Sequence, residues 1–187
     1  MRNALAIDCT LGADNIMEET SNNTIPGMYL DTSNPAECGG QLTNWSLCYY
    51  RLPFGLRIYQ VELQVWGVNS DGSYTLKDTS TETLSIFFEL SLFKCRSFIL
   101  TENEYIQVER GDILGVYLPG HSEDDTALAV IGSGTDQDVL EYALPMPASD
   151  AAPLRLTRIS GVRMHISANI GKQNDKYCSQ FCIIHLV

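Results

Sequence analysis

A run of seven residues, 60–66, constrains the fold more than any other part of this chain. Apolar and polar side chains alternate along it: the apolar members are Val61, Leu63 and Val65, and the polar members are Gln60, Glu62 and Gln64. Successive side chains of an extended strand point to opposite faces. The run therefore predicts a strand with one buried face and one solvent-facing face. The Asp-Gly pair that follows, within residues 69–72, predicts a hairpin turn because it tolerates positive φ.

Other short segments with the composition of strands follow the same pattern, separated by turns. They cover residues 73–77, 83–90, 94–100, 105–108, 113–118, 126–131, 139–144 and 161–168. No stretch of about ten residues shows the 3.6-residue period of an amphipathic helix. Many short strands without crossover helices predict an all-β fold, an antiparallel β-sandwich of the jelly-roll-like kind.

The chain divides into three parts by composition. Residues 1–24 are polar and are expected to form an extended lead-in that pairs at a sheet edge, and residues 25–170 form the β-sandwich domain. Residues 171–187 are a C-terminal tail or the start of a following segment. The chain lacks the apolar core of a signal peptide and a membrane-spanning run, so we expect a fragment of a longer chain.

The charge balance excludes several kinds of partner. The chain has 12 Lys and Arg against 23 Asp and Glu, for a net charge of −11. A nucleic-acid partner needs clusters of basic residues that displace counterions, and none occurs here. Direct binding to an anionic membrane is disfavoured for the same reason, so membrane attachment is expected only through missing parts of a longer chain.

The even number of cysteines, six, suits an oxidising compartment. A disulfide between Cys38 and Cys48 would close a short loop, and this pairing is the one we expect. Cys9 with Cys95 is the second expected pair, and the last two cysteines form a third pair or remain free thiols: Cys178 and Cys182. Zinc is the rival reading for the last two, with His185 nearby, but no paired zinc-ligand spacing is present.

Two sequons for N-linked glycosylation strengthen the extracellular assignment. They begin at Asn22 and Asn44, in segments that we interpret as loops, and Asn44 lies inside the expected Cys38–Cys48 loop. The expected location is therefore extracellular, either secreted or as the ectodomain of a membrane protein.

A block of cysteine and aromatic residues resembles a signature of predicted surface proteins of sponges and cnidarians. The block spans residues 34–40 and 44–50, and similar pieces follow at 59–66, 93–95 and 111–117. The resemblance covers about residues 9–145. It implies an extracellular, β-rich module at the N-terminal end of a large receptor-like or adhesion-like protein, and no established biochemical activity.

No catalytic constellation is evident in the sequence. The three histidines have no nucleophile motif around them, and sequence spacing cannot place two carboxylates across a cleft. Trp66 and Tyr117 are expected in the core. The candidate ligand-binding residues are Trp45, Tyr49 and Tyr50, which could stack on a sugar ring or anchor a protein. No cofactor is expected; Ca²⁺ at an acidic loop is a weaker alternative to plain solvation, with candidate ligands Glu123, Asp124 and Asp125.

Three hypotheses about function remain open at this point. The leading one is a non-catalytic extracellular recognition or adhesion module that binds a glycan or a protein partner. The first alternative is an oligomerisation module through which a surface protein assembles. The second alternative is a carbohydrate-active enzyme.

Overall fold

A computed structural model describes residues 9–12, 27–51, 57–86, 93–119, 128–129, 131–143 and 156–171. Within these residues the chain is all-β and its strands pair antiparallel, which confirms the predicted fold class. The helical structure described is one short 3-10 turn, η1 (Glu102–Glu104). No helix among the described residues is long and apolar enough to cross a membrane.

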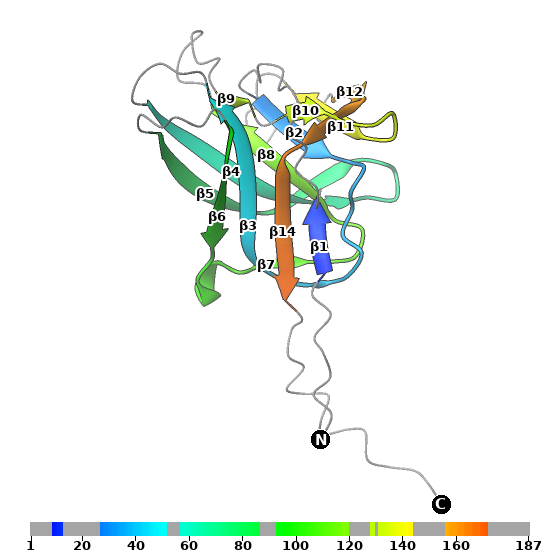
Figure 1. Ribbon diagram of the computed structural model, residues 1–187. Helices are drawn as coiled ribbons and strands as arrows, with labels where there is room; N and C mark the ends of the chain where they lie inside the picture. Colours follow the sequence, from blue (N-terminus) through cyan, green and yellow to red (C-terminus); the bar gives the residue numbers. More distant parts are fainter. Residues whose placement is uncertain are drawn as a thin grey trace, which may run out of the picture.

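The strands form two large sheets and one small one (Figure 1). Sheet A has the order β1 (Cys9–Gly12), β14 (Ile166–Gly171), β3 (Gly40–Arg51) and β6 (Phe93–Ile99), and β3 also pairs with β7 (Ile106–Val108) and β9 (Leu128–Ala129). Sheet B has the order β12 (Thr157–Ser160), β11 (Val139–Ala143), β2 (Gly27–Asp31), β8 (Ile113–Leu118), β4 (Arg57–Val68) and β5 (Tyr74–Ile86). The small sheet pairs β10 (Ile131–Ser133) with β13 (Val162–Met164).

The strand pairs are nested along the chain. β1 pairs with β14, β2 with β8, β3 with β6, and β4 with β5, so each pair encloses the next in sequence. The expectation that the lead-in pairs at a sheet edge is confirmed, because β1 is the edge strand of sheet A.

The main core lies between the two sheets. Sheet A contributes Leu42 and Leu47 among others, and sheet B contributes Leu63 and Val116, all with no exposed surface. The predicted alternation in β4 is confirmed on this side, because Val61, Leu63 and Val65 all face the core.

The opposite face of sheet B is not the wet surface that the alternation predicted. A second core lies there, formed by Met28, Leu30, Trp66, Ile113 and Ala143. Gln64 is also fully buried; it accepts a hydrogen bond from Trp66 Nε1 at 3.0 Å and donates one to Glu62 at 2.8 Å. Trp66 is therefore buried, as expected, but in this second core, and Tyr117 packs against the same cluster half-buried.

Two disulfides are present among the described residues, and their pairing corrects the one expected from the sequence. Cys9 bonds to Cys38 and Cys48 bonds to Cys95, so the expected pairs Cys38–Cys48 and Cys9–Cys95 are wrong. Cys38 lies just before β3, whereas Cys48 lies near the far end of that strand. Because an extended chain advances about 3.3 Å per residue, the two cysteines are too far apart to bond to each other. The third expected pair, Cys178 with Cys182, lies outside the described residues.

The Cys48–Cys95 bond joins directly opposed residues of neighbouring strands, with their Cα atoms 3.9 Å apart. The amide of Cys48 donates to His165, on the other side of β3. The Cys48–Cys95 pair is therefore a non-hydrogen-bonded pair, where opposed side chains are closest. Two disulfides indicate folding in an oxidising environment.

Strand β3 occupies a segment that the sequence suggested was a loop. Its pairing with β14 shifts by one residue, so that Asn169 opposes Asn44 while Ile170 opposes Leu42. Thr43 is the extra residue of this β-bulge. The bulge breaks the alternation of β3, which is why the strand was not recognisable as one.

Candidate functional site

The aromatic residues proposed from the sequence as ligand contacts are not on the surface. Trp45 is fully buried and stacks on Phe98 with ring centroids 4.4 Å apart, and Tyr49 is 2% exposed in the main core. Both point inward because the side chains of β3 alternate between the two faces of sheet A, and Trp45 and Tyr49 lie on the face toward the core. The prediction that they bind ligand is wrong, and the side chain of Tyr50 is outside the described part of the chain.

Of the candidate glycosylation and metal-binding residues, one lies in a strand and the others lie outside the described residues. Asn44 lies in β3 and not in a loop; its Oδ1 accepts a hydrogen bond from Asn169 at 2.7 Å. Asn22 and the acidic residues 123–125 lie outside the described residues. Within the described ranges, no group of three or more His, Cys, Asp or Glu side chains is placed to hold a metal ion.

A pocket of about 710 Å³ lies at one end of the two-layered fold. Three segments that are far apart in sequence meet there: the start of the β2–β3 connection, the end of the β4–β5 hairpin, and the β7–β8 turn (Figure 1). The lining residues that carry its chemistry are Asn69, Tyr74, Thr75, Lys77, Arg110 and Asp112.

The β4–β5 hairpin supplies one wall. Its turn is closed by the amide of Gly72, which donates to Asn69 O at 2.9 Å, and Gly72 has the positive φ of 81° that the Asp-Gly signal predicted. Asn69 Nδ2 then donates to the hydroxyls of Ser73 and Thr75, both at 2.9 Å. These bonds fix the hairpin end at the pocket.

A β-bulge in β5 aims a lysine into the site. Val65 opposes Asp78 but Trp66 opposes Leu76, which leaves Lys77 as the extra residue. Bulges commonly re-aim a side chain in this way. A Cβ at Gly67 on the facing strand would lie 2.9 Å from Lys77 Cε, so the glycine leaves the lysine room to cross the strand.

The β7–β8 turn supplies the opposite wall and the acceptors for that lysine. Gly111 adopts a φ of 93°, and the carboxylate of Asp112 accepts the Glu109 amide at 2.7 Å. Ala36 donates its amide to Asp112 O at 2.7 Å, which ties the turn to the β2–β3 connection. The left-handed backbone of Gly111 and the hydrogen bond accepted by Asp112 together shape this turn.

Lys77 bridges two carboxylates at the pocket. Its ammonium lies 2.9 Å from Asp112, whose side chain is 5% exposed, and 2.5 Å from Glu109, whose side chain is 73% exposed. Burial lowers the pKa of Lys77, but the hydrogen bonds to Glu109 and Asp112 outweigh it and raise the pKa above its ordinary value. The hydrogen bond between Lys77 and Glu109 also lowers the pKa of Glu109.

Two further side chains complete the lining. Arg110 is exposed at the tip of the turn and forms no ion pair with any residue that the structure describes. Tyr74 is half-buried, and burial together with its hydrogen bond to Glu141 raises the pKa of its hydroxyl. The site thus offers a cation, an ion-paired cluster, an aromatic ring, and hydroxyl and amide groups.

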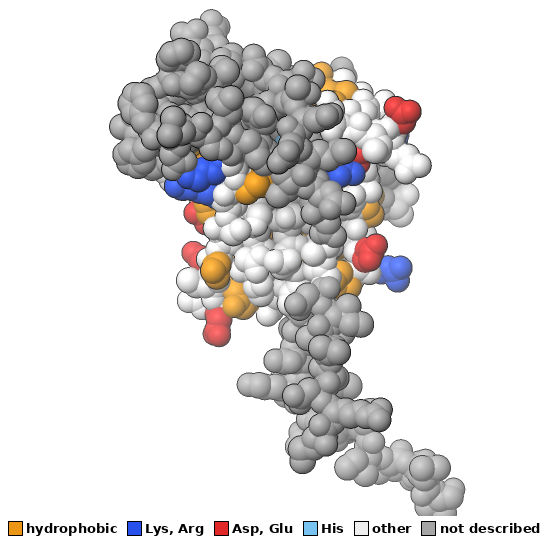
Figure 2. Space-filling model, viewed as in Figure 1, with side chains coloured by type: hydrophobic (Ala, Val, Ile, Leu, Met, Phe, Trp, Pro, Cys, Tyr) orange, Lys and Arg blue, Asp and Glu red, His pale blue; other side chains and the backbone are white. Residues whose placement is uncertain are grey.

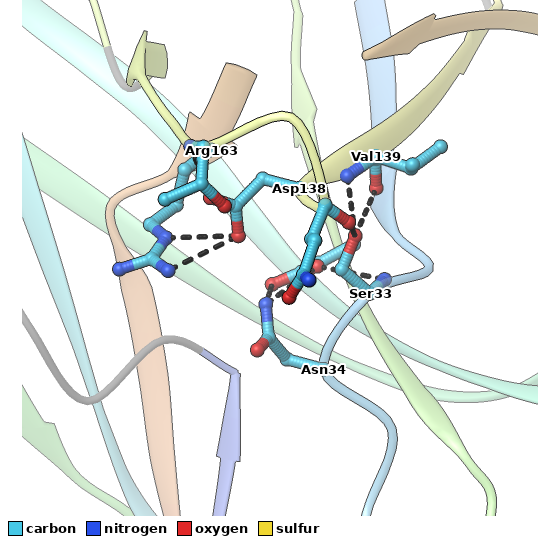
Figure 3. A network of polar contacts seen from close by, with 8 residues as sticks. Ser33, Asn34, Asp138, Val139 and Arg163 are labelled. Carbon is cyan, nitrogen blue, oxygen red and sulfur yellow. Dashed lines mark hydrogen bonds and ion pairs between the residues drawn. The ribbon is translucent and has the colours of Figure 1, made fainter. Parts of the chain in front are cut away.

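A second polar cluster, next to the small sheet, has a structural role (Figure 3). Arg163 donates to Asp138 at 3.1 and 3.2 Å, and Thr135 donates its amide and hydroxyl to the same carboxylate. Burial opposes the charge of Asp138, but the bonds from Thr135 and Arg163 outweigh it and lower its pKa.

Asp31 accepts hydrogen bonds from Asn34 and Ser33 in the same region, yet its burial raises its pKa. Ser33 also exchanges hydrogen bonds with Val139, donating to its carbonyl at 3.1 Å and accepting from its amide. The cluster therefore fastens the β2–β3 connection to β11 and does not open onto the pocket.

Comparisons of the chain with protein-family models, with curated proteins and with solved structures find no match. The function therefore has to be inferred from the residues of the site.

Proposed function

We propose that this chain is a non-catalytic extracellular recognition module that binds a glycan, or a glycan-bearing protein partner, in the pocket between the β4–β5 hairpin and the β7–β8 turn. The single observation that carries the proposal is the pocket itself, about 710 Å³ with polar groups held in place by hydrogen bonds. Ligand sites of small molecules are commonly about 300–1,000 Å³ and largely pre-formed.

The mixture of groups in the lining suits a saccharide. A sugar ring presents hydroxyls next to apolar C–H surface, and the pocket presents Asn69, Thr75 and Lys77 next to Val68 and Tyr74. Such groups can bond the hydroxyls while the aromatic ring of Tyr74 packs against the C–H surface of the sugar.

The ion pairing of the two carboxylates at the pocket favours recognition over catalysis. Glu109 and Asp112 both bind the ammonium of Lys77 and also shape the turn. A glycosidase would need one carboxyl group that keeps a proton for the leaving oxygen. Hydrogen bonding to Lys77 lowers the pKa of Glu109, which is the opposite direction.

The nested strand pairing supports placing the fold in the jelly-roll class, whose chain runs as one long folded hairpin across two sheets. The disulfides support an extracellular site of action, either secreted or in an ectodomain. An adhesion or receptor-like parent protein fits both features.

The proposal is tested by a broad glycan-array screen of the full chain, followed by calorimetry with any hit and with two variants. Thr75→Trp fills the pocket, and Thr81→Trp is the matched control, an exposed threonine on the same strand that does not line it. We expect at least about tenfold weaker binding for Thr75→Trp alone. A screen with no glycan hit, or equal loss in both variants, would refute the proposal.

A further inference from the structure

The outward side of sheet A carries no charged side chain among the residues whose side chains are described. We call this surface the neutral face. It consists of Thr10, Gln41, Thr43, Asn44, Ser46, Cys95, Ser97, Ile99, Gln107, Ser167 and Asn169. Figure 2 shows the middle of this face in white, with red and blue side chains toward its margins.

This absence of charge contrasts with the rest of the protein. The chain carries 23 acidic and 12 basic residues and a net charge of −11. Solvent-facing sheet surfaces of such a protein would ordinarily share those charges, because charged side chains keep exposed strands soluble and unpaired. Depletion of charge is instead a feature of the centre of protein–protein interfaces.

The polar groups of the neutral face already satisfy one another across the strands. The hydroxyls of Ser46 and Ser97 lie 2.8 Å apart, and Asn169 donates to Asn44 Oδ1 at 2.7 Å. Covering a polar group is costly when it loses its hydrogen bond to water and gains none. These pairs keep their bonds when the face is covered, which lowers the cost of burying it.

An apolar side chain also lies exposed on the same face. Ile99, at the end of β6, is 85% exposed and is directly opposite Asn44. Burying this side chain against a second copy would favour association.

We infer that the neutral face is a self-association surface, and that its occupant is a second copy of this chain. Two molecules of charge −11 repel each other wherever their acidic surfaces meet, and this face lets them approach without opposing charges. A two-fold arrangement places the same face on both sides. The inference goes beyond the proposed function, which rests on a different part of the molecule.

The size of the face indicates a weak association. Four strands about 4.8 Å apart and about six residues long cover roughly 400 Å² in projection per copy. Specific interfaces usually bury about 800 Å² of accessible surface per partner, so this face is about half the usual size and falls in the range of weak, transient contacts. We therefore expect a dimer that dissociates on dilution.

The Asn44 sequon lies on the same face, so glycosylation and self-association exclude each other. Asn44 is outward-facing and sits between β14 and β6, where a glycan on its Nδ2 would project into the second copy. Occupancy of this sequon would therefore hold the chain monomeric.

The test is sedimentation velocity of the full chain, with Asn44 unoccupied, from low to high micromolar concentration. Asn169→Lys and Asn169→Asp each place a charge at an exposed central position of the face, and each brings like charges together across a two-fold axis. We expect both to weaken association by at least about tenfold. Ser97→Lys, on the exposed strand β6, is a second variant if Asn169 proves important for folding.

The matched controls are Thr81→Lys and Thr81→Asp, on an exposed position of sheet B. We expect them to associate like the unaltered chain, and material glycosylated at Asn44 to stay monomeric. A monomer at every concentration with Asn44 unoccupied would overturn the inference. So would a loss of association in the Thr81 variants equal to that in the Asn169 variants, or a loss with only one sign of charge.

Discussion

Asp112 is the residue on which the shape of the pocket depends most. Its buried carboxylate accepts the Glu109 amide and the Lys77 ammonium, and so it fixes both the turn and the lysine. Asp112→Asn keeps the size but replaces one acceptor oxygen with a donor. We expect it to lower the free energy of unfolding by about 1–3 kcal/mol, measured by urea denaturation.

Glu109 provides the matched control for that substitution. It contacts the same ammonium, but its side chain is 73% exposed, and exposed ion pairs contribute little. Glu109→Gln should leave the urea midpoint nearly unchanged. If it destabilised the chain as much as Asp112→Asn, burial would not explain why Asp112 stabilises the turn.

Gly132 shows a second place where one residue decides a local packing arrangement. A Cβ there would lie against His165 Nε2 and 3.0 Å from its Cε1. Gly132→Ala should force the ring to move and cost about 1–3 kcal/mol of stability. Gly171→Ala is the control, because its Cβ would be no closer than 3.4 Å to Thr43, and it should destabilise the chain clearly less. The two variants are compared by thermal denaturation.

His165 also predicts how stability responds to acid. Burial, and then the nearby charge of Arg163, lower its pKa below the ordinary value of 6.5. The unfolded chain therefore takes up a proton below about pH 6.5 that the folded chain does not. This contribution to stability is complete above pH 6.5 and is lost as the pH falls through the lowered folded pKa.

The measurement is the urea midpoint from pH 7.5 to 5.5, for the unaltered chain and for His165→Gln. We expect a smaller decline in the variant. The comparison separates His165 from Asp31, whose raised pKa acts in the opposite direction because protonation of Asp31 favours the folded state. Identical declines in both proteins would contradict the assignment to His165.

At the scale of the strands, prediction succeeded where polar and apolar residues alternate and failed where that pattern is absent or disturbed. β4 was recognisable because its core-facing residues alternate without a break. β2 was not, because all five of its residues are buried: Tyr29 faces the main core while Met28 and Leu30 face the second. A strand that has apolar side chains on both faces shows no polar alternation. β3 was not recognisable for a different reason, because the bulge at Thr43 breaks its alternation.

The disulfides follow from strand register, which spacing in the sequence does not reveal. Cys48 and Cys95 bond because β3 and β6 align them, although 47 residues separate them. Peptide mapping without reduction tests the pairing; cleavage after Glu19 and Trp45 puts Cys9, Cys38 and Cys48 on three peptides. We expect Cys9 linked to Cys38 and Cys48 linked to Cys95. A peptide joining Cys38 to Cys48 would contradict the register of β3.

Removing each disulfide measures how much it contributes to the free energy of unfolding. Closing loops of 29 and 47 residues should stabilise the fold by about 2–4 kcal/mol each, with the larger value for Cys48–Cys95. The paired variants Cys9→Ala with Cys38→Ala, and Cys48→Ala with Cys95→Ala, are compared by urea denaturation. An unchanged midpoint in either pair would show that the corresponding bond does not stabilise the fold.

At the scale of the whole molecule, the pocket was beyond prediction because it belongs to no single segment. Part of its turn chemistry was visible: the Asp-Gly hairpin was expected and occurs, and it faces the β7–β8 turn across the pocket. Their approach to each other depends on the pairing of β4 with both β5 and β8 across sheet B. The lysine that joins them is aimed by a bulge, and no glycine within β5 marks that bulge in the sequence.

Sheet B has a core on each face, and this arrangement predicts how the molecule unfolds. Trp45 lies in the main core and Trp66 in the second, and the sequence contains two tryptophans. Trp66→Phe leaves fluorescence to report on the main core, and Trp45→Phe leaves it to report on the second. Strands β2 and β4 supply side chains to both cores, so neither core can lose its packing without disturbing the other.

We therefore expect one cooperative transition, with fluorescence and far-ultraviolet circular dichroism giving the same urea midpoint within each variant. The comparison is made within a variant because each substitution changes stability in its own way. Trp45 Nε1 has no hydrogen-bond partner among the described residues, whereas Trp66 Nε1 donates to Gln64. A fluorescence midpoint below the dichroism midpoint in Trp45→Phe would show that the second core melts first, on its own.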